Sequence, residues 1–391
     1  MRMPGALEGG GRPRARARAG RRWRPRRGTT FAAFALSAIL LALVFLARNP
    51  RHAVDRGLHG APRNATAASC GDDGAPPPSD GPYNAIRSRL YADMAGEAAA
   101  RGITVLDGEG AGAGAARRAT QNLTNDSIFD TRAVAAGAAA ADARVDAISR
   151  GIRPVLHRLD EPVRAVVVPL VGAASARNGE AIERIHRSVV RNLEPLANGN
   201  RSNIWVQDHE NYHASIFHTS HHLSPTTFRD AGVEDRGALL RHESTVLREL
   251  FGEFCAVVLV LERIIVTSGG AVLGLWQVLE RDETRANDVS HVRERLRGAF
   301  PYAPAKQMST PYIVHTTFAR VIHGVAGAGS SAVGRDSFDA VDRACRQMMA
   351  ELCGLEVDVD RYWFVEERDL LALALRGDFT AESLPLRCER R

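Results

Sequence analysis

The chain has 391 residues, of which 45% are hydrophobic and 25% charged, and this supports one substantial globular domain with additional segments. Its formal net charge of +6 is unevenly distributed, because ten arginines and one acid precede Gly28 and the rest of the chain carries about −3. This charge distribution excludes a basic nucleic-acid-binding surface as the role of the bulk of the protein.

An apolar segment follows the arginine-rich arm of residues 1–28. The seventeen residues from Phe31 to Ala47 carry no charge, and as a helix they span about 25 Å, near the lower limit for a bilayer. We expect an uncleaved transmembrane signal anchor at residues 29–48. The positive-inside rule then predicts a single-pass type II membrane protein of the secretory pathway, in the ER or Golgi, with its domain in the lumen. A cleaved signal peptide and an organelle transit peptide are the alternatives.

Glycosylation sequons bear on this orientation. Four N-glycosylation sequons lie on the expected lumenal side and predict a glycoprotein; they begin at Asn64, Asn122, Asn125 and Asn200.

The five cysteines are too few and too scattered for a disulfide scaffold. Their odd number leaves one thiol unpaired or paired between chains, for which Cys70 is the candidate. Cys255, inside an apolar run, is expected to be a small buried hydrophobe.

The composition of residues 49–160 predicts a stem with an Ala-rich helical region, and the chain could form a homodimer through this stem. Helical patterns there cover Asn84–Arg101 and Thr131–Arg150. The compact domain is expected at residues 161–378, and residues 379–391 are expected to be a C-terminal tail.

Within the compact domain, alternating and continuous apolar runs predict strands at Val163–Val171, Asn203–Phe217, Ala256–Thr267, Ala271–Leu279, Tyr312–Val321 and Arg361–Glu367. The third and fourth of these strands are joined by Ser268-Gly269-Gly270, which predicts a hairpin. Helical spacing predicts helices at Gly179–Leu196, Arg236–Phe254, Asp288–Phe300 and Phe338–Leu352. The order of these elements divides into two similar halves. We therefore predict an α+β fold with two lobes and a cleft on a pseudo-twofold axis.

Each half contains a strand in which a histidine stands two residues before a hydroxyl side chain. His213 precedes Ser215, and His315 precedes Thr317. Residues i and i+2 of a strand point to the same face, so each strand presents an imidazole beside a hydroxyl. Six of the thirteen histidines have Ser or Thr two positions on, but only these two combine apolar flanks, strand context and matching places in the halves. Such a set is equipped for metal-free phosphoester chemistry.

With these two motifs, the chain from about Val163 to Glu367 resembles the 2H phosphoesterase superfamily, the group of cyclic phosphodiesterases and RNA-ligase-like proteins. Three segments also resemble plant and green-algal single-pass membrane proteins of unassigned activity: Tyr212–His218, Leu273–Val278 and Ile313–Arg320. The resemblance implies the fold and the reaction class but not the substrate. Ser215 stands where threonine is commoner, and the stem and anchor lie outside the usual pattern, which disfavours a cytosolic role in RNA processing.

We expect a membrane-anchored, lumen-facing phosphodiesterase that hydrolyses a cyclic phosphate or a 2′-linked nucleotide phosphodiester, in a small molecule or at an RNA end, without metal or cofactor. One histidine removes a proton from the attacking water or hydroxyl, and the other protonates the leaving oxygen. The hydroxyls of Ser215 and Thr317 bind the non-bridging oxygens. Tyr212 and Arg320 are the further substrate-binding candidates. The sequence does not assign the acid and the base.

Other classes of protein fit parts of the pattern. His209-Glu210-Asn211-Tyr212-His213 matches His-Glu-x-x-His, so a zinc metalloprotease with Glu210 as base and Glu234 or Glu243 as third ligand is the first alternative. A non-catalytic nucleotide-binding domain is the second. A Golgi glycosyltransferase shares the topology, and its nearest acidic motif here is Asp358-Val359-Asp360. Three tryptophans in strand-like runs are expected in the core rather than as stacking platforms: Trp205, Trp276 and Trp363.

Overall fold

The computed structural model describes residues 83–104, 128–130, 147–149, 152–171, 176–197, 203–280, 287–305, 310–322 and 333–387. The expected arginine-rich arm, the expected anchor at residues 29–48 and most of the stem lie outside them. Among the described helices, none has the length and apolar character needed to cross a membrane.

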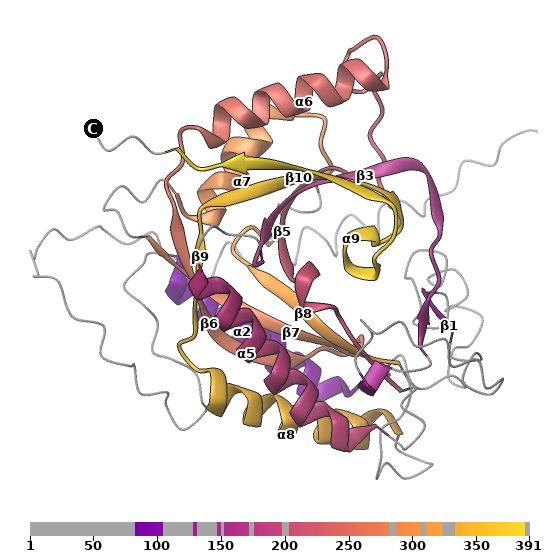
Figure 1. The fold of residues 1–391 in the computed structure, drawn as a ribbon, viewed down its shortest axis with the longest axis vertical. Coiled ribbons are helices and arrows are strands. Elements are labelled where there is room, and N and C mark those ends of the chain that lie inside the picture. The colour runs from indigo at the N-terminus through magenta and orange to yellow at the C-terminus, as the bar shows by residue number, and fades with distance from the viewer. Residues whose placement is uncertain are drawn as a thin grey trace, which may run out of the picture. The chain divides into compact units, whose positions relative to one another are not determined.

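Two antiparallel sheets organise the described chain, which confirms an α+β fold (Figure 1). The first sheet has the order β11-β10-β3-β5. Its strands are β3 (Arg158–Pro169), β5 (His213–Ser220), β10 (Arg361–Asp369) and β11 (Phe379–Pro385). Strand β11 pairs with β10 along its length, so residues 379–385 belong to the sheet and are not the expected tail. Their weak apolar pattern reflects an edge position, where few side chains become buried.

The second sheet has the order β4-β8-β7-β6-β9. Its strands are β4 (Ile204–Val206), β6 (Val257–Val266), β7 (Ala271–Glu280), β8 (His315–Val321) and β9 (Glu356–Val359). Strands β6 and β7 form the predicted hairpin, in which Gly270 adopts a φ of 76°. The two motif strands therefore belong to different sheets, β5 to the first and β8 to the second.

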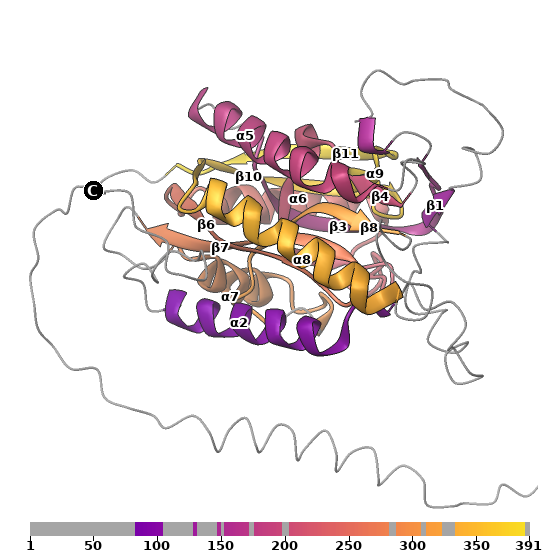
Figure 2. The same cartoon turned by 90° about the horizontal axis from the view of Figure 1, so that it is seen from below.

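Helices cover both faces of the second sheet (Figure 2). Helices α5 (Ala176–Leu193) and α8 (Val333–Leu352) pack together on one face, and α2 (Asn84–Arg101) packs on the other, against β6 and β7. Helix α6 (Arg236–Phe251) contacts β10 and β11, α7 (Val289–Ala299) contacts β5, and the short α9 (Ala372–Leu375) contacts β10. The helix predicted at Asn84–Arg101 has these bounds, but it is packed on the sheet.

Short elements complete the described chain. A two-stranded sheet pairs β1 (Phe129–Asp130) with β2 (Arg153–Pro154). Single turns of 3₁₀ helix lie at Ala147–Ser149, Glu194–Leu196 and His209–Asn211. Aspartates begin two of the helices, because the Asp235 side chain accepts from the Ala238 amide at α6 and the Asp288 side chain accepts from the Ser290 amide at α7.

The cysteines depart from expectation. Cys255 and Cys353 are disulfide-bonded, and Cys345 is a buried free thiol. The expectation that Cys255 is only a small buried hydrophobe is therefore wrong. The sequence separation of cysteines does not reveal which of them approach closely enough to bond, because a disulfide depends on Cα positions in the folded chain.

Candidate active site

The two motif strands have the same local construction. In β5 the pairing with β3 shifts register between Ser215 and Phe217, and in β8 the pairing with β7 shifts between Thr317 and Ala319. Each strand thus contains a β-bulge three residues after its histidine. A bulge inserts one residue into a strand and turns the side chains that follow it. The residues 213–218 and 315–320 are structurally matched.

The same positions of both strands are partly exposed. His213, Ser215 and His218 alternate with buried neighbours in β5, and His315, Thr317 and Arg320 do the same in β8. The bulge keeps the third residue of each set on the face of the first two. We call these six residues the motif faces of the strands. Each motif face thus carries the imidazole and hydroxyl that the sequence predicted, followed by a third polar side chain.

The two strands lie against each other across the sheets. Strands β5 and β8 are in contact. The ring of Tyr212, which precedes β5, packs 5.0 Å from the ring of Phe318 in the β8 bulge, measured between ring centroids. The charge of His213 acts on the ionisation of His315. His213 and His315 are therefore brought to one region of the fold, while the predicted cleft between them stays a prediction.

Electrostatics distinguish the two histidines. Burial, together with the positive charges of Arg293, His213 and Arg320, lowers the pKa of His315 to about 4. Burial also lowers the pKa of His213, and the hydrogen bond to the Asn211 carbonyl opposes that shift. His315 is therefore neutral at pH 7 and able to accept a proton.

A backbone carbonyl fixes the orientation of the first histidine. His213 Nδ1 lies 2.8 Å from the Asn211 carbonyl oxygen, which can only accept, so Nδ1 carries the proton and Nε2 is the nitrogen left for chemistry. The same carbonyl accepts from Gln207 Nε2 at 2.8 Å. The backbone amide of Gln207 donates to the Phe318 carbonyl at 2.8 Å. The orientation of His213 is thereby linked to the bulge of β8, a link that sequence reasoning missed.

Arg293, which the sequence did not single out, clamps both motif strands. Its side chain is 5% exposed and lies in α7. It donates to the carbonyls of Ser215 (3.3 Å) and Ile216 (2.7 Å) in β5, to Ile313 (2.8 Å) before β8, and to Pro311. Burial lowers the pKa of Arg293 to about 10, so it remains a cation at neutral pH. It holds the two strands together and supplies positive charge beside His315.

Helix α2 completes the support of the segment before His315. The fully buried Arg87 donates through Nε to the Tyr312 carbonyl (2.9 Å) and forms an ion pair with Asp288, the capping residue of α7 (2.6 Å). The Tyr91 hydroxyl lies 3.1 Å from the Val314 carbonyl oxygen and accepts from the Val314 amide at 3.0 Å. The segment before His315 is therefore bonded to both α2 and α7. An arginine and a tyrosine within a helical pattern gave no functional signal in the sequence.

Similarity to known proteins is found among solved structures. No protein-family model matches the chain, and no curated protein matches it. Among solved structures, it is similar to TT0787 of Thermus thermophilus, with 13% identity, 58% of this chain and 100% of that chain covered, and a TM-score of 0.34. It is similar to Usb1 of Kluyveromyces marxianus, with 12% identity, 57% and 98% covered, and a TM-score of 0.36.

A third similar structure is ATU0111 of Agrobacterium tumefaciens str. C58, a conserved protein of unknown function. It has 13% identity, 62% of this chain and 91% of that chain covered, and a TM-score of 0.39. With TM-scores below 0.5, these three similarities carry no conclusion about activity.

Of the two further substrate-binding candidates, one shares the motif face and the other does not. Arg320 is partly exposed beside Thr317, and burial lowers its pKa without removing its charge at neutral pH. Tyr212 is 1% exposed, and its hydroxyl lies 3.3 Å from His186 Nδ1. Tyr212 is therefore a core residue, because the residue before a strand's first motif position points into the interior, and its role in substrate binding stays a prediction.

The zinc-protease interpretation is not supported by the backbone. His209–Asn211 form one 3₁₀ turn and His213 begins β5, so the two histidines of the pattern do not share the face of an α-helix. His209 Nε2 instead pairs with Glu183 at 3.0 Å. Within the described residues, no three His, Cys, Asp or Glu side chains are grouped to hold a metal ion. Asp360 of the glycosyltransferase-like motif pairs with Arg361 at 2.9 Å.

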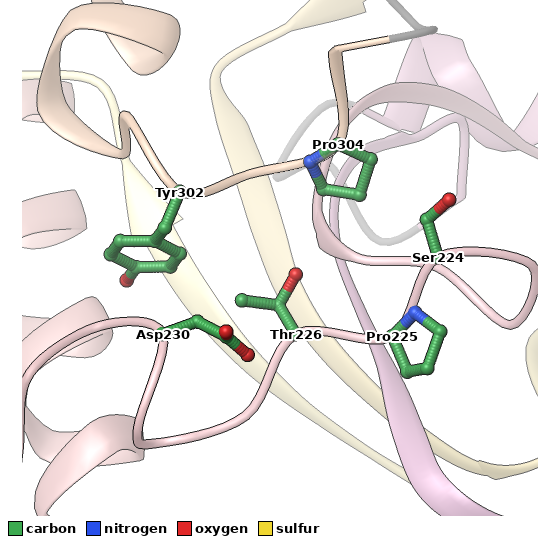
Figure 3. A pocket seen from close by; sticks show the side chains of 6 residues that line it. All are labelled: Ser224, Pro225, Thr226, Asp230, Tyr302 and Pro304. Atoms are coloured by element: carbon green, nitrogen blue, oxygen red, sulfur yellow. The ribbon is translucent and has the colours of Figure 1, made fainter.

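Two surface pockets lie away from the motif faces. One, of about 350 Å³, lies beside the loop after β5 and the segment after α7, and Figure 3 shows its lining side chains: Ser224, Pro225, Thr226, Asp230, Tyr302 and Pro304. Beneath it, the Tyr302 hydroxyl lies 3.1 Å from Glu243. The other, of about 540 Å³, lies between α5 and α8 and is lined by Arg184, Arg187, Ser188, Arg191, Glu351 and Leu352. Neither pocket includes a predicted site residue.

Proposed function

We propose that this protein is a phosphodiesterase of the 2H type that opens a cyclic phosphate or cleaves a 2′-linked nucleotide phosphodiester. The observation that carries the proposal is the pair of equally built motif strands, whose histidines interact electrostatically and whose motif faces both present hydroxyls. The nearby cations Arg293 and Arg320 favour an anionic ligand there.

In the proposed reaction, His315 is the general base. Its neutral imidazole takes a proton from water as the water oxygen bonds to phosphorus. The bond from phosphorus to the leaving oxygen breaks, and Nε2–H of protonated His213 donates its proton to that oxygen. His213 has this role because its hydrogen bond to the Asn211 carbonyl favours the protonated ring, and a bound phosphodiester anion would raise the pKa of nearby imidazoles. The proton on His315 returns to His213 through solvent before the next turnover.

The remaining polar groups act on the phosphate. In the proposed complex, the hydroxyls of Ser215 and Thr317 donate to the non-bridging oxygens, where negative charge accumulates in the transition state. The guanidinium of Arg320 adds a positive charge on the same face as Thr317. Arg293 is a positioning residue, since its donors are used by backbone carbonyls.

The location of the enzyme is part of the proposal. We infer a signal anchor at residues 29–48 and a lumenal domain that acts on a small phosphodiester or an RNA end. The disulfide-bonded Cys255 and Cys353 support an oxidising compartment, since structural disulfides are rare in the cytosol. Protease protection of tagged protein in intact microsomes tests the orientation, and digestion of the domain from outside the vesicles would overturn it.

The activity is tested with purified full-length protein and nucleoside 2′,3′-cyclic phosphates. We expect His213→Ala and His315→Ala each to lower kcat by about 10² to 10⁴, as loss of general acid or base catalysis does. His242→Ala changes an exposed histidine of α6 and is the matched control. Turnover should persist in EDTA, and its loss on chelation would contradict the proposed chemistry. Stoichiometric binding of the nucleotide with no product formed would instead indicate a non-catalytic domain.

A further inference from the structure

The registers of the first sheet place one tryptophan on the motif face of β5. Ser215 pairs with Val167 of β3, and Val167 pairs with Trp363 of β10. Directly paired residues of antiparallel strands project to the same face. Trp363 is therefore on the face of Ser215, two strands away, which is about 10 Å at the usual spacing of neighbouring strands.

Trp363 rests on an apolar patch and keeps part of its side chain exposed. The patch consists of the buried residues Ala165, Val167, Val365 and Leu373, with Trp363 and Phe379 packed against them and only partly buried. Leu373 belongs to α9, which lies against β10. The ring thus packs against aliphatic side chains and keeps part of its surface exposed.

The other two tryptophans of the described chain have different surroundings. Trp276 is 0% exposed, and its Nε1 donates to the Thr316 hydroxyl at 3.1 Å. Trp205 is 7% exposed and packs against Phe129 with ring centroids 5.2 Å apart. These two are core residues, as the sequence predicted. The expectation that Trp363 is also a core residue is therefore only partly met, because its side chain projects on the same face of the sheet as Ser215 and is partly exposed.

We propose that Trp363 is a stacking platform for the planar heteroaromatic base of the substrate, which makes the substrate a nucleotide and not a phosphodiester lacking a base. This inference rests on the proposed function, which places the phosphate between Ser215 and Thr317. A ribose then separates the phosphate from a base lying over β3 and β10.

The chemistry of stacking sets the expected selectivity. Stacking of a base on an aromatic side chain contributes about 1 to 3 kcal/mol and depends little on which base is present, because every base has a π-face. Because each 1.4 kcal/mol of binding free energy changes the affinity about tenfold, this corresponds to a change in affinity of about 5- to 150-fold. We therefore expect adenosine and uridine substrates to differ little, and both to bind more tightly than a base-free analogue.

The experiment compares adenosine 2′,3′-cyclic phosphate with 1-O-methylribose 2,3-cyclic phosphate, using full-length protein. Trp363→Leu keeps an apolar cover on the patch and removes the π-face, and Trp363→Phe restores a smaller one. We expect Trp363→Leu to raise KM for the nucleotide about 5- to 150-fold, with kcat and the base-free substrate unaffected, and Trp363→Phe to recover part of the loss. Phe379→Ala, which alters the same patch outside the Ser215 row, is the matched control.

Binding is measured separately by quenching of tryptophan fluorescence with the nucleotide, in His315→Ala protein with and without Trp363→Leu. Equal effects of Trp363→Leu on both substrates, or none, would overturn the platform while leaving the phosphodiesterase intact. Failure of every phosphodiester to react, with quenching that still depends on Trp363, would instead overturn the proposed function and leave the base site standing.

Discussion

The depressed pKa of His315 gives the sharpest test of the site. A shift from 6.5 to about 4 corresponds to about 3 kcal/mol of preference for the neutral imidazole in the folded protein, at about 1.4 kcal/mol per unit. The unfolded chain takes up this proton first as the pH falls. The stabilisation is therefore fully present above pH 6.5 and is lost as the pH falls through about 4.

Two measurements report the protonation of His315. NMR of ¹³C-labelled histidine should show His315 titrating near pH 4, assigned by its disappearance in His315→Gln. In urea unfolding between pH 4 and 7, the free energy of unfolding of wild type should fall by up to about 3 kcal/mol more than that of His315→Gln as the pH falls. His242→Gln, on the exposed side of α6, is the control for replacing a histidine outside the site.

The cause of the shift is also testable. Arg320→Gln removes one of the positive charges acting on His315, so its titration should move upward, towards 6.5. Arg320→Lys keeps the charge and should leave the titration nearer to the wild-type value. A His315 resonance that titrates at 6.5 or above in wild-type protein would refute both its burial against cations and its assignment as the general base.

Further predictions concern the support of the site. Tyr91→Phe should cost about 1 to 3 kcal/mol in urea unfolding and lower kcat, because it removes the hydroxyl that accepts from the buried Val314 amide before His315, whereas Glu97→Ala on the exposed side of α2 should do neither. Gly274→Ala should destabilise the domain by about 1 to 3 kcal/mol, because its Cβ would lie 2.4 Å from the buried ring of Phe318; an unchanged thermal midpoint would contradict this packing. Burial raises the pKa of Glu367 to about 7, so its contribution to stability is present below pH 4.5 and is lost as the pH rises through 7. The free energy of unfolding of Glu367→Gln should therefore rise by about 1 to 3 kcal/mol relative to that of wild type between pH 4.5 and 8. Unfolding free energies that change in parallel with pH would contradict this.

Much of the local structure could be predicted because it depends on local patterns. The helix at Asn84–Arg101 and the hairpin around Gly270 have nearly the predicted bounds, since helical spacing and a Gly-Gly turn are short-range signals. The strand β11 was missed because an edge strand buries few side chains and so shows little alternation. The burial of Tyr212 was not predicted, because adjacency to a motif histidine says nothing about which way a side chain points.

The supporting residues could not be predicted for a different reason. Arg293 is separated from Ser215 and Ile313 along the chain, and a charged residue in a helical pattern normally indicates a solvated face. Its burial is tolerated because backbone carbonyls of β5 and of the segment before β8 satisfy its donors, and only the folded chain brings those carbonyls together. The exposure of Trp363 likewise depends on which strands become its neighbours.

The sequence by itself determined the two histidine and hydroxyl pairs and their strand conformation, because a period of two in side-chain direction is a property of the backbone alone. Only the tertiary structure decided that β5 and β8 lie in different sheets yet touch, that matching bulges turn His218 and Arg320 onto the motif faces, and that burial and nearby positive charges depress the pKa of His315. Burial and charge act through space, so they arise from packing between segments that the linear order keeps far apart.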